Sequence, residues 1–152
     1  MCIKVPLSQK IKRTQKAGPL ILALEYNKMG VLGFYNVIRD KYPGVTEIAD
    51  KEHIQIWGDV DPEFAYSWFE SLANALNKEM TEGVDAEKYK GLLNFISAHF
   101  QAGDEEVKNC IDVAFTENLF WQVPAVKAEV YWKVLPDNLK GLYVNFHRSV
   151  PH

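Results

Sequence analysis

This 152-residue chain has few of the residues and spacings that carry recognisable chemistry. Its two cysteines, Cys2 and Cys110, show neither the spacing of a disulfide framework nor that of a zinc site. The four histidines are scattered at positions 53, 99, 147 and 152, and none stands with an acid or a cysteine at metal-site spacing. There is also no glycine-rich phosphate loop and no nucleophile motif. We therefore predict no catalytic residue, no metal and no cofactor.

Long apolar runs are absent as well. No stretch approaches the roughly 20 apolar residues that a membrane-spanning helix needs, and the charged N-terminus is not followed by the apolar core of a signal peptide. Cysteines without a disulfide framework fit a reducing compartment. These absences predict a cytoplasmic protein with free thiols and no membrane association.

The charges of the chain are unevenly distributed. Five basic residues between positions 4 and 16 precede the first acid, Glu25, whereas the remainder carries 12 basic and 20 acidic residues, a net −8. Residues 1–17 are thus a basic arm, which is either loose, a short first helix, or laid across the acidic body. Because the arm lacks interleaved aromatic residues, nucleic-acid binding is the weaker interpretation. An acidic body suits a basic protein partner.

The best-formed predicted helix spans residues 103–121. A left-handed Gly103 is expected to end the preceding helix and Asp104 to cap the next one. At about 100° per residue, apolar and polar side chains separate onto two faces. The apolar face holds Val107, Cys110, Ile111, Ala114 and Phe115, and the polar face holds Lys108, Asn109, Asp112 and Thr116. Asn118 projects into the apolar face, where an unpaired amide costs roughly 1 to 3 kcal/mol, so we predict that it ties down the turn at 120–124.

Helical signals recur along the rest of the chain. One helix spans 31–42 and stops at Pro43-Gly44, and another begins at Asp61-Pro62-Glu63 and runs to about Met80 with an apolar arc so wide that it should be central. The third begins at Asp85 and ends at Gly103. Two more cover about 125–134 and the stretch after Pro136-Asp137, the latter with Leu139, Leu142, Tyr143 and Phe146 inward. Residues 19–30 are compatible with either a helix or a strand.

The least regular part is residues 46–61, where Ile54, Ile56 and Trp57 follow an extended, alternating pattern. Together these patterns predict a single all-α domain over residues 18–152. It is an antiparallel array of about five to seven helices with one short extended segment near 53–57.

Candidate binding residues lie in two places, because irregular segments and polar helix ends often carry function. They are Glu52, His53, Trp57, Asp59, Glu117 and Asn118. The structural alternative is that Asp59 suits a turn at Gly58, Asp61 is a helix cap and Glu52-His53 is an exposed dipeptide. A Cys110–His99 thiolate pair is disfavoured, since burial on the helix face would raise the pKa of the thiol.

The segment EEVKNCIDVAFTENL (105–119), with HIQIWGDVDPEF (53–64) before it and LPDNLKGL (135–142) after it, resembles a family of short, uncharacterised bacterial all-helical proteins, a domain of unknown function. The similarity covers residues 36–145. The resemblance implies no activity, and members of that family look like small acidic immunity or accessory proteins of bacterial toxin systems.

Two functions from different classes follow. The first is a non-catalytic intracellular protein-interaction module, such as an immunity protein whose acidic face neutralises a basic partner. The second is a small metal-dependent or hydrolytic enzyme that uses residues 52–61. The four tryptophans, at 57, 68, 121 and 132, fill a core or leave a dimer patch; we expect a homodimer through a helix face.

Overall fold

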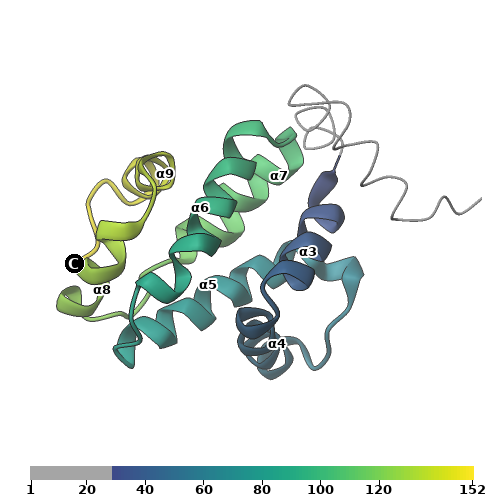
Figure 1. Cartoon of the computed structure of the whole chain (residues 1–152), viewed down its shortest axis with the longest axis horizontal. Coiled ribbons are helices and arrows are strands. Elements are labelled where there is room, and N and C mark those ends of the chain that lie inside the picture. Colours follow the sequence, from purple (N-terminus) through teal and green to yellow (C-terminus); the bar gives the residue numbers. More distant parts are fainter. Residues whose placement is uncertain (1–28) are drawn as a thin grey trace, which may run out of the picture.

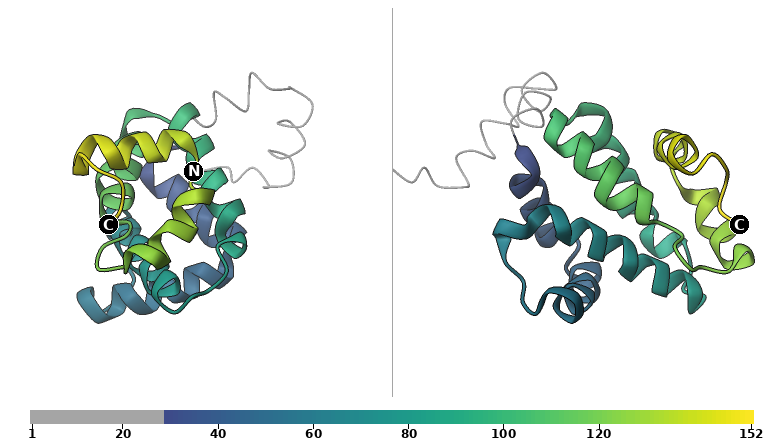
Figure 2. Two further views of the ribbon diagram at one scale, coloured as in Figure 1. Left: turned by 90° about the vertical axis from the view of Figure 1, so that its left-hand side faces the viewer. Right: turned by 180° about the vertical axis from the view of Figure 1, so that it is seen from behind.

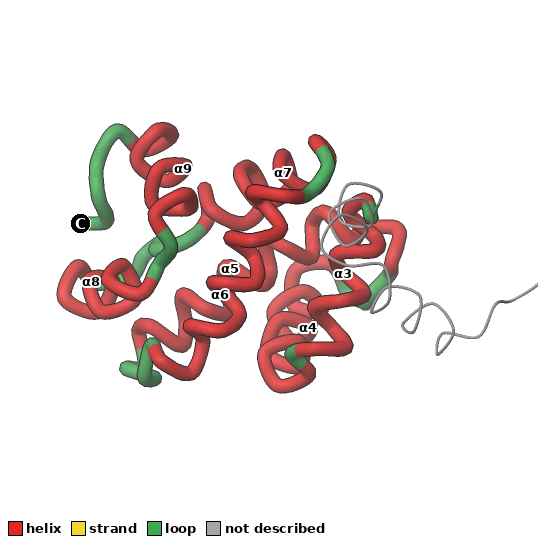
Figure 3. Tube along the Cα trace, turned by 45° about the horizontal axis from the view of Figure 1, so that its top comes forward, coloured by secondary structure: helices red, strands yellow, loops and turns green. Residues whose placement is uncertain are grey.

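A computed structural model describes residues 29–152 as an array of helices (Figure 1). The helices are α3 (Gly30–Lys41), α4 (Pro43–Trp57), α5 (Ala65–Thr81), α6 (Glu87–Ala102), α7 (Glu105–Asn109), α8 (Ala125–Val134) and α9 (Asp137–His147). Three short segments complete them: the 3₁₀ turns η1 (Pro62–Phe64) and η3 (Thr116–Asn118) and the π-helix η2 (Cys110–Phe115). This part of the chain contains no strand (Figure 3), which confirms the all-α prediction. The basic arm and residues 18–28 lie outside the described residues.

Helix α5 lies at the centre of the fold. Ten of its 17 residues are buried, and it contacts α3, α4, α8 and the π-helix η2. Helix α4 crosses it steeply, while α8 and α9 lie together at the opposite end of the molecule (Figures 1 and 2). The wide apolar arc thus correctly predicted a central helix, because a helix packed on several sides needs apolar residues around most of its circumference.

Helix α4 corrects the sequence-based prediction for residues 46–61. Pro43 occupies the first position of α4 instead of stopping the chain, since its fixed φ suits a helix N-terminus. The break lies one residue earlier, at Tyr42, with φ −125° and ψ 64°. Residues 53–57 are therefore helical, and the predicted extended segment is wrong. The alternating pattern came from Ile54, Ile56 and Trp57, which are all exposed and so carry no periodicity of burial.

Three aspartates cap helices as the sequence predicts. Asp61 accepts a hydrogen bond from the backbone N–H of Glu63 at 2.9 Å, and Asp85 from that of Glu87 at 3.0 Å. Asp104 accepts from the Val107 N–H at 2.8 Å. Each bond satisfies one backbone donor that the first helical turn leaves free.

Gly103 is needed for a reason other than the predicted one. Its φ of −74° is extended and not left-handed. A Cβ at this position would instead collide with the carbonyl oxygen of His99, to which the Gly103 N–H donates a 2.7 Å hydrogen bond. Glycine thus permits a close backbone approach that lets α7 turn back along α6 (Figure 1).

Two aromatic side chains, of which Phe146 was predicted to face inward, are exposed. Phe64 precedes α5 and is 53% exposed, and Phe146 near the end of α9 is 54% exposed. Both stand at the ends of their helices, beyond the neighbouring elements that cover the helix centres.

Candidate binding site

The loop between η3 and α8, residues 119–124, has an unusual backbone. Phe120 and Gln122 adopt φ values of 68° and 56°, in the left-handed region that non-glycine residues rarely enter. Between them, Trp121 is 67% exposed, whereas Phe120 is only 6% exposed. Such conformations cost on the order of 1 kcal/mol or more each, and they persist only where surrounding contacts enforce them.

Asn77 of α5 supplies those contacts. Its side-chain Nδ2 donates to the carbonyl of Asn118 at 2.8 Å, and its Oδ1 accepts from the N–H of Phe120 at 2.7 Å. The Phe120 ring is further held edge-on against Trp132 and Tyr143. One buried amide and two aromatic contacts therefore fix the backbone on which Trp121 is carried.

Asn118 does not play the role predicted for it. Its side-chain Nδ2 donates to the carbonyl of Ala114 at 2.7 Å, within its own helical segment. The amide that ties down the following turn is Asn77, from a helix about 40 residues earlier in the chain. The prediction that the Asn118 side chain ties down this turn is therefore wrong.

The π-helix η2 precedes this loop and changes the helix register. As predicted, the apolar face of the 103–121 segment is buried, and this includes Cys110. Thr116 was expected on the polar face but is completely buried. The wider π turn (i→i+5 hydrogen bonding) rotates every later side chain relative to an α-helix. Helical structure ends at Asn118, and Trp121 belongs to the loop.

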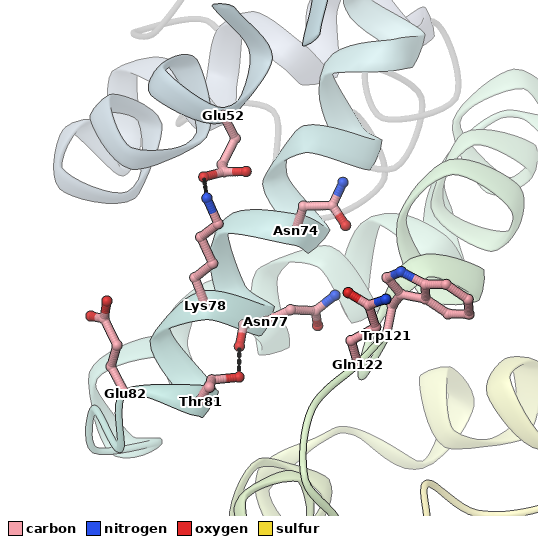
Figure 4. A pocket seen from close by; sticks show the side chains of 8 residues that line it. All are labelled: Glu52, Asn74, Asn77, Lys78, Thr81, Glu82, Trp121 and Gln122. Carbon is pink, nitrogen blue, oxygen red and sulfur yellow. Dashed lines mark hydrogen bonds and ion pairs between the residues drawn. The ribbon is translucent and has the colours of Figure 1, made fainter. Parts of the chain in front are cut away.

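A pocket of about 380 Å³ lies beside the loop. It is lined by Glu52 of α4, by Asn74, Asn77, Lys78 and Thr81 of α5, by Glu82, and by Trp121 and Gln122 of the loop. Lys78 forms an ion pair with Glu52, and the Thr81 hydroxyl donates to the Asn77 carbonyl at 2.9 Å. Figure 4 shows the amides of Asn74, Asn77 and Gln122 lying between that ion pair and the indole of Trp121. The walls thus combine one aromatic surface with several polar groups.

The four candidate residues near positions 52–59 lie in different surroundings. Glu52 lines the pocket and is 9% exposed, while His53 is 1% exposed with its Nδ1 2.9 Å from the Ser71 hydroxyl. Burial lowers the pKa of His53. Trp57 is 52% exposed at the end of α4, and Asp59 is exposed in the turn that follows. The prediction of an exposed Glu52-His53 dipeptide is wrong, because the helical backbone turns both side chains onto α5.

Glu117 lies outside the pocket. Its side chain is half-buried, and this burial raises its carboxyl pKa, with the neighbouring charge of Asp112 adding to the effect. The Glu117 carbonyl lies 3.0 Å from Nε2 of His147 on α9. Among the six predicted binding residues, the structure places only Glu52 at the pocket wall.

Sequence reasoning missed the residues that shape the pocket. Asn77 stands within the apolar arc of α5, and the argument applied to Asn118 applies to it equally. Trp121 was assigned to a helix, although Phe120, Trp121 and Gln122 in succession cannot all face a core. These two signals were present in the sequence.

The grouping of possible ligand side chains and the length and apolarity of the helices bear on metal binding and membrane association in residues 29–152. No three of their histidine, cysteine, aspartate and glutamate side chains are grouped so that they could hold a metal ion. None of the helices in this range is both long and apolar enough to cross a membrane. Cys110 is fully buried, and burial raises the pKa of its thiol, as the sequence predicted.

Charge divides the described chain into two parts. Residues 29–123 carry 17 acidic and 7 basic residues, a net −10, whereas residues 124–152 carry 2 acidic and 4 basic residues, a net +2. All the residues that line the pocket, from Glu52 to Gln122, belong to the acidic part. Its surroundings therefore favour positively charged ligands.

A family described as a domain of unknown function, DUF7674, matches residues 35–149. The matched stretch contains every residue that lines the pocket. No curated protein and no solved structure matches the chain. Because the match covers well over half of its length, the chain belongs to the DUF7674 family.

Proposed function

We propose that this protein is a non-catalytic protein-binding module whose partner contacts the Trp121 loop. The observation that carries the proposal is the exposed indole of Trp121 between two left-handed residues. Left-handed conformations at non-glycine positions cluster at functional sites, where the surrounding structure maintains them. Here Asn77 holds the loop backbone through its two hydrogen bonds, to the carbonyl of Asn118 and the N–H of Phe120.

A fixed, exposed tryptophan is suited to be an interface anchor. Tryptophan is among the residues most enriched at binding hot spots, and it contributes a large contact area through only two side-chain torsions. Because Trp121 is carried by a loop that is already ordered, little backbone freedom remains to be lost on binding. The pocket beside it supplies polar groups that would set specificity.

The partner is proposed to be basic. The net −10 of residues 29–123 would attract a positively charged protein and accelerate its association at low ionic strength. This charge supports the more specific hypothesis of an immunity or accessory protein that neutralises a basic toxin domain. The cytoplasmic location and the homodimer remain predictions, and sedimentation velocity would measure the latter.

The test is affinity capture from the source cells with three immobilised proteins: the unmodified chain, Trp121→Ala and Trp57→Ala. Trp57 is the matched control because it is also a largely exposed tryptophan but does not line the pocket. We expect a protein retained at low salt by the unmodified chain and by Trp57→Ala, and lost with Trp121→Ala. Equal retention by all three proteins, or none by any of them, would contradict the proposal.

A further inference from the structure

The pocket beside Trp121 is lined by several side chains with hydrogen-bond acceptor oxygens and by a single cationic side chain. Glu52 and Glu82 contribute carboxylates, and the side-chain amides of Asn74 and Gln122 contribute carbonyl oxygens. Lys78 is the single cationic side chain among the lining residues, and it binds Glu52. The pocket therefore keeps a net negative charge and an aromatic wall.

The same molecule shows which side chain such surroundings hold. The guanidinium of Arg39 binds both carboxylate oxygens of Asp50, at 2.6 and 2.9 Å. It also lies over the rings of Tyr35 and Trp68, 5.0 and 5.8 Å from their centres. A planar guanidinium satisfies carboxylate and aromatic surfaces together, through paired hydrogen bonds and stacking.

We propose that the pocket receives an arginine side chain of the partner, with its guanidinium against the Trp121 indole and its N–H groups on the oxygens of Asn74, Gln122 and Glu52. This inference rests on the protein-binding function proposed above. Arginine fits better than lysine because its five donors can reach acceptors that come from two helices and a loop. Lys78 competes for Glu52 and so limits the affinity of the unmodified pocket.

The competing ligand chemistry is a carboxylate bound by Lys78. The two possibilities make opposite predictions for Lys78→Gln, which removes the positive charge but keeps a donor for Glu52. An arginine should bind more tightly to this variant, since a carboxylate is released from its ion pair. A carboxylate ligand should bind less tightly, since its cation is gone.

The experiment uses the full chain, labelled with ¹⁵N, and blocked Gly-Arg-Gly, Gly-Lys-Gly and Gly-citrulline-Gly tripeptides. The Trp121 indole signal is identified by its absence from Trp121→Phe. We expect it to shift saturably with the arginine peptide. Binding should be about tenfold weaker for the neutral citrulline peptide, a difference of about 1.4 kcal/mol, and intermediate for lysine. Equal responses to arginine and citrulline, or no response at all, would overturn the proposal.

The control for Lys78→Gln is Lys51→Gln. Lys51 is also on the surface and paired with an acid, Glu47, but it does not line the pocket. Both variants change the net charge equally, so only a local effect distinguishes them. We expect the arginine peptide to bind several-fold more tightly to Lys78→Gln than to Lys51→Gln. Weaker binding to Lys78→Gln would overturn the arginine assignment, while loss of a captured protein on Trp121→Ala would still support the protein-binding function.

Discussion

Trp68 and Trp121 lie beside similar chemical groups but in opposite surroundings. Trp68 donates a hydrogen bond to Asp50, the α4 acid of an ion pair with Arg39, and Trp121 lines the same pocket as the ion pair between Lys78 and Glu52, also of α4. Trp68 is 1% exposed and Trp121 is 67% exposed. The Trp68 indole is covered by other side chains of the same protein. The Trp121 pocket leaves an aromatic surface and several polar groups open to a partner.

The difference arises from the backbone that carries each indole. Trp68 is part of the central helix α5, with its Nε1 donating to Asp50 at 2.8 Å and its ring edge-on to Phe69. Trp121 stands on a loop in which Phe120 and Val123 are buried, while Trp121 and Gln122 face outward. The closed tryptophan, Trp68, should therefore determine stability, and the open one, Trp121, should determine binding.

The largest effect is expected from Trp68→Ala. Removing a fully buried tryptophan costs about 3 to 5 kcal/mol, because buried contacts are lost and a cavity remains. The change also removes the hydrogen bond to Asp50. The measurement is the free energy of unfolding from urea denaturation, with Trp68→Phe as the control that keeps an aromatic ring. If the free energy of unfolding fell by less than about 1 kcal/mol, within the range of ordinary substitutions, Trp68 would not be part of the stabilising core.

Asn77→Leu should have the next largest effect, because Asn77 supports the open tryptophan from within the core. The substitution leaves the N–H of Phe120 and the carbonyl of Asn118 without their partner. The buried N–H of Phe120 should cost about 1 to 3 kcal/mol and the partly buried carbonyl of Asn118 about 1 kcal/mol, so the expected loss is about 2 to 4 kcal/mol. Amide hydrogen exchange of Phe120 should rise as well.

The matched control is Asn74→Leu, one turn earlier on α5 and half-buried. It should change the unfolding free energy by less than about 1 kcal/mol. Asn118→Leu, which breaks only the bond to Ala114, should also cost less than Asn77→Leu. If Asn118→Leu destabilised the protein more than Asn77→Leu, Asn118 and not Asn77 would be the residue that holds the loop.

Lowering the pH should have a smaller effect on stability, through the buried histidines His53 and His99. Burial lowers the pKa of His53 and His99, while nearby Asp50 and Asp59 partly oppose the shift at His53. The unfolded chain therefore takes up protons first as the pH falls through about 6.5, and stability falls with it. Urea denaturation between about pH 7 and pH 5 should show this decline. His53→Gln should make the decline shallower, and an unchanged slope would contradict the assignment of His53.

The sequence predicted helices and caps well because these depend on local chemistry. Asp61, Asp85 and Asp104 each act on a backbone N–H two or three residues away, so their role can be inferred from neighbouring residues alone. The central position of α5 followed from its wide apolar arc for the same reason. At α4 the prediction failed because exposed apolar residues interrupted the pattern of burial.

The candidate site was harder to predict because it depends on distant residues. Asn77 reaches a loop more than 40 positions later, and only Glu52 among the predicted binding residues lines the pocket. The π-helix shifted the register of side chains after Cys110, which a period of 3.6 residues does not anticipate. Left-handed Phe120 and Gln122 have no local signature either, since glycine or asparagine usually marks such positions.

The smallest effect on stability is expected from Trp121→Ala, although its effect on binding should be the greatest. Most of the indole is already in water, so its removal forfeits little buried area, and the free energy of unfolding should change by no more than about 0.5 kcal/mol. Trp57→Ala, at a similarly exposed position, should behave in the same way. If Trp121→Ala instead destabilised the protein by more than about 2 kcal/mol, the indole would be contributing to the folded core. Loss of a partner in that variant would then follow from unfolding, and the distinction between the closed and the open tryptophan would fail.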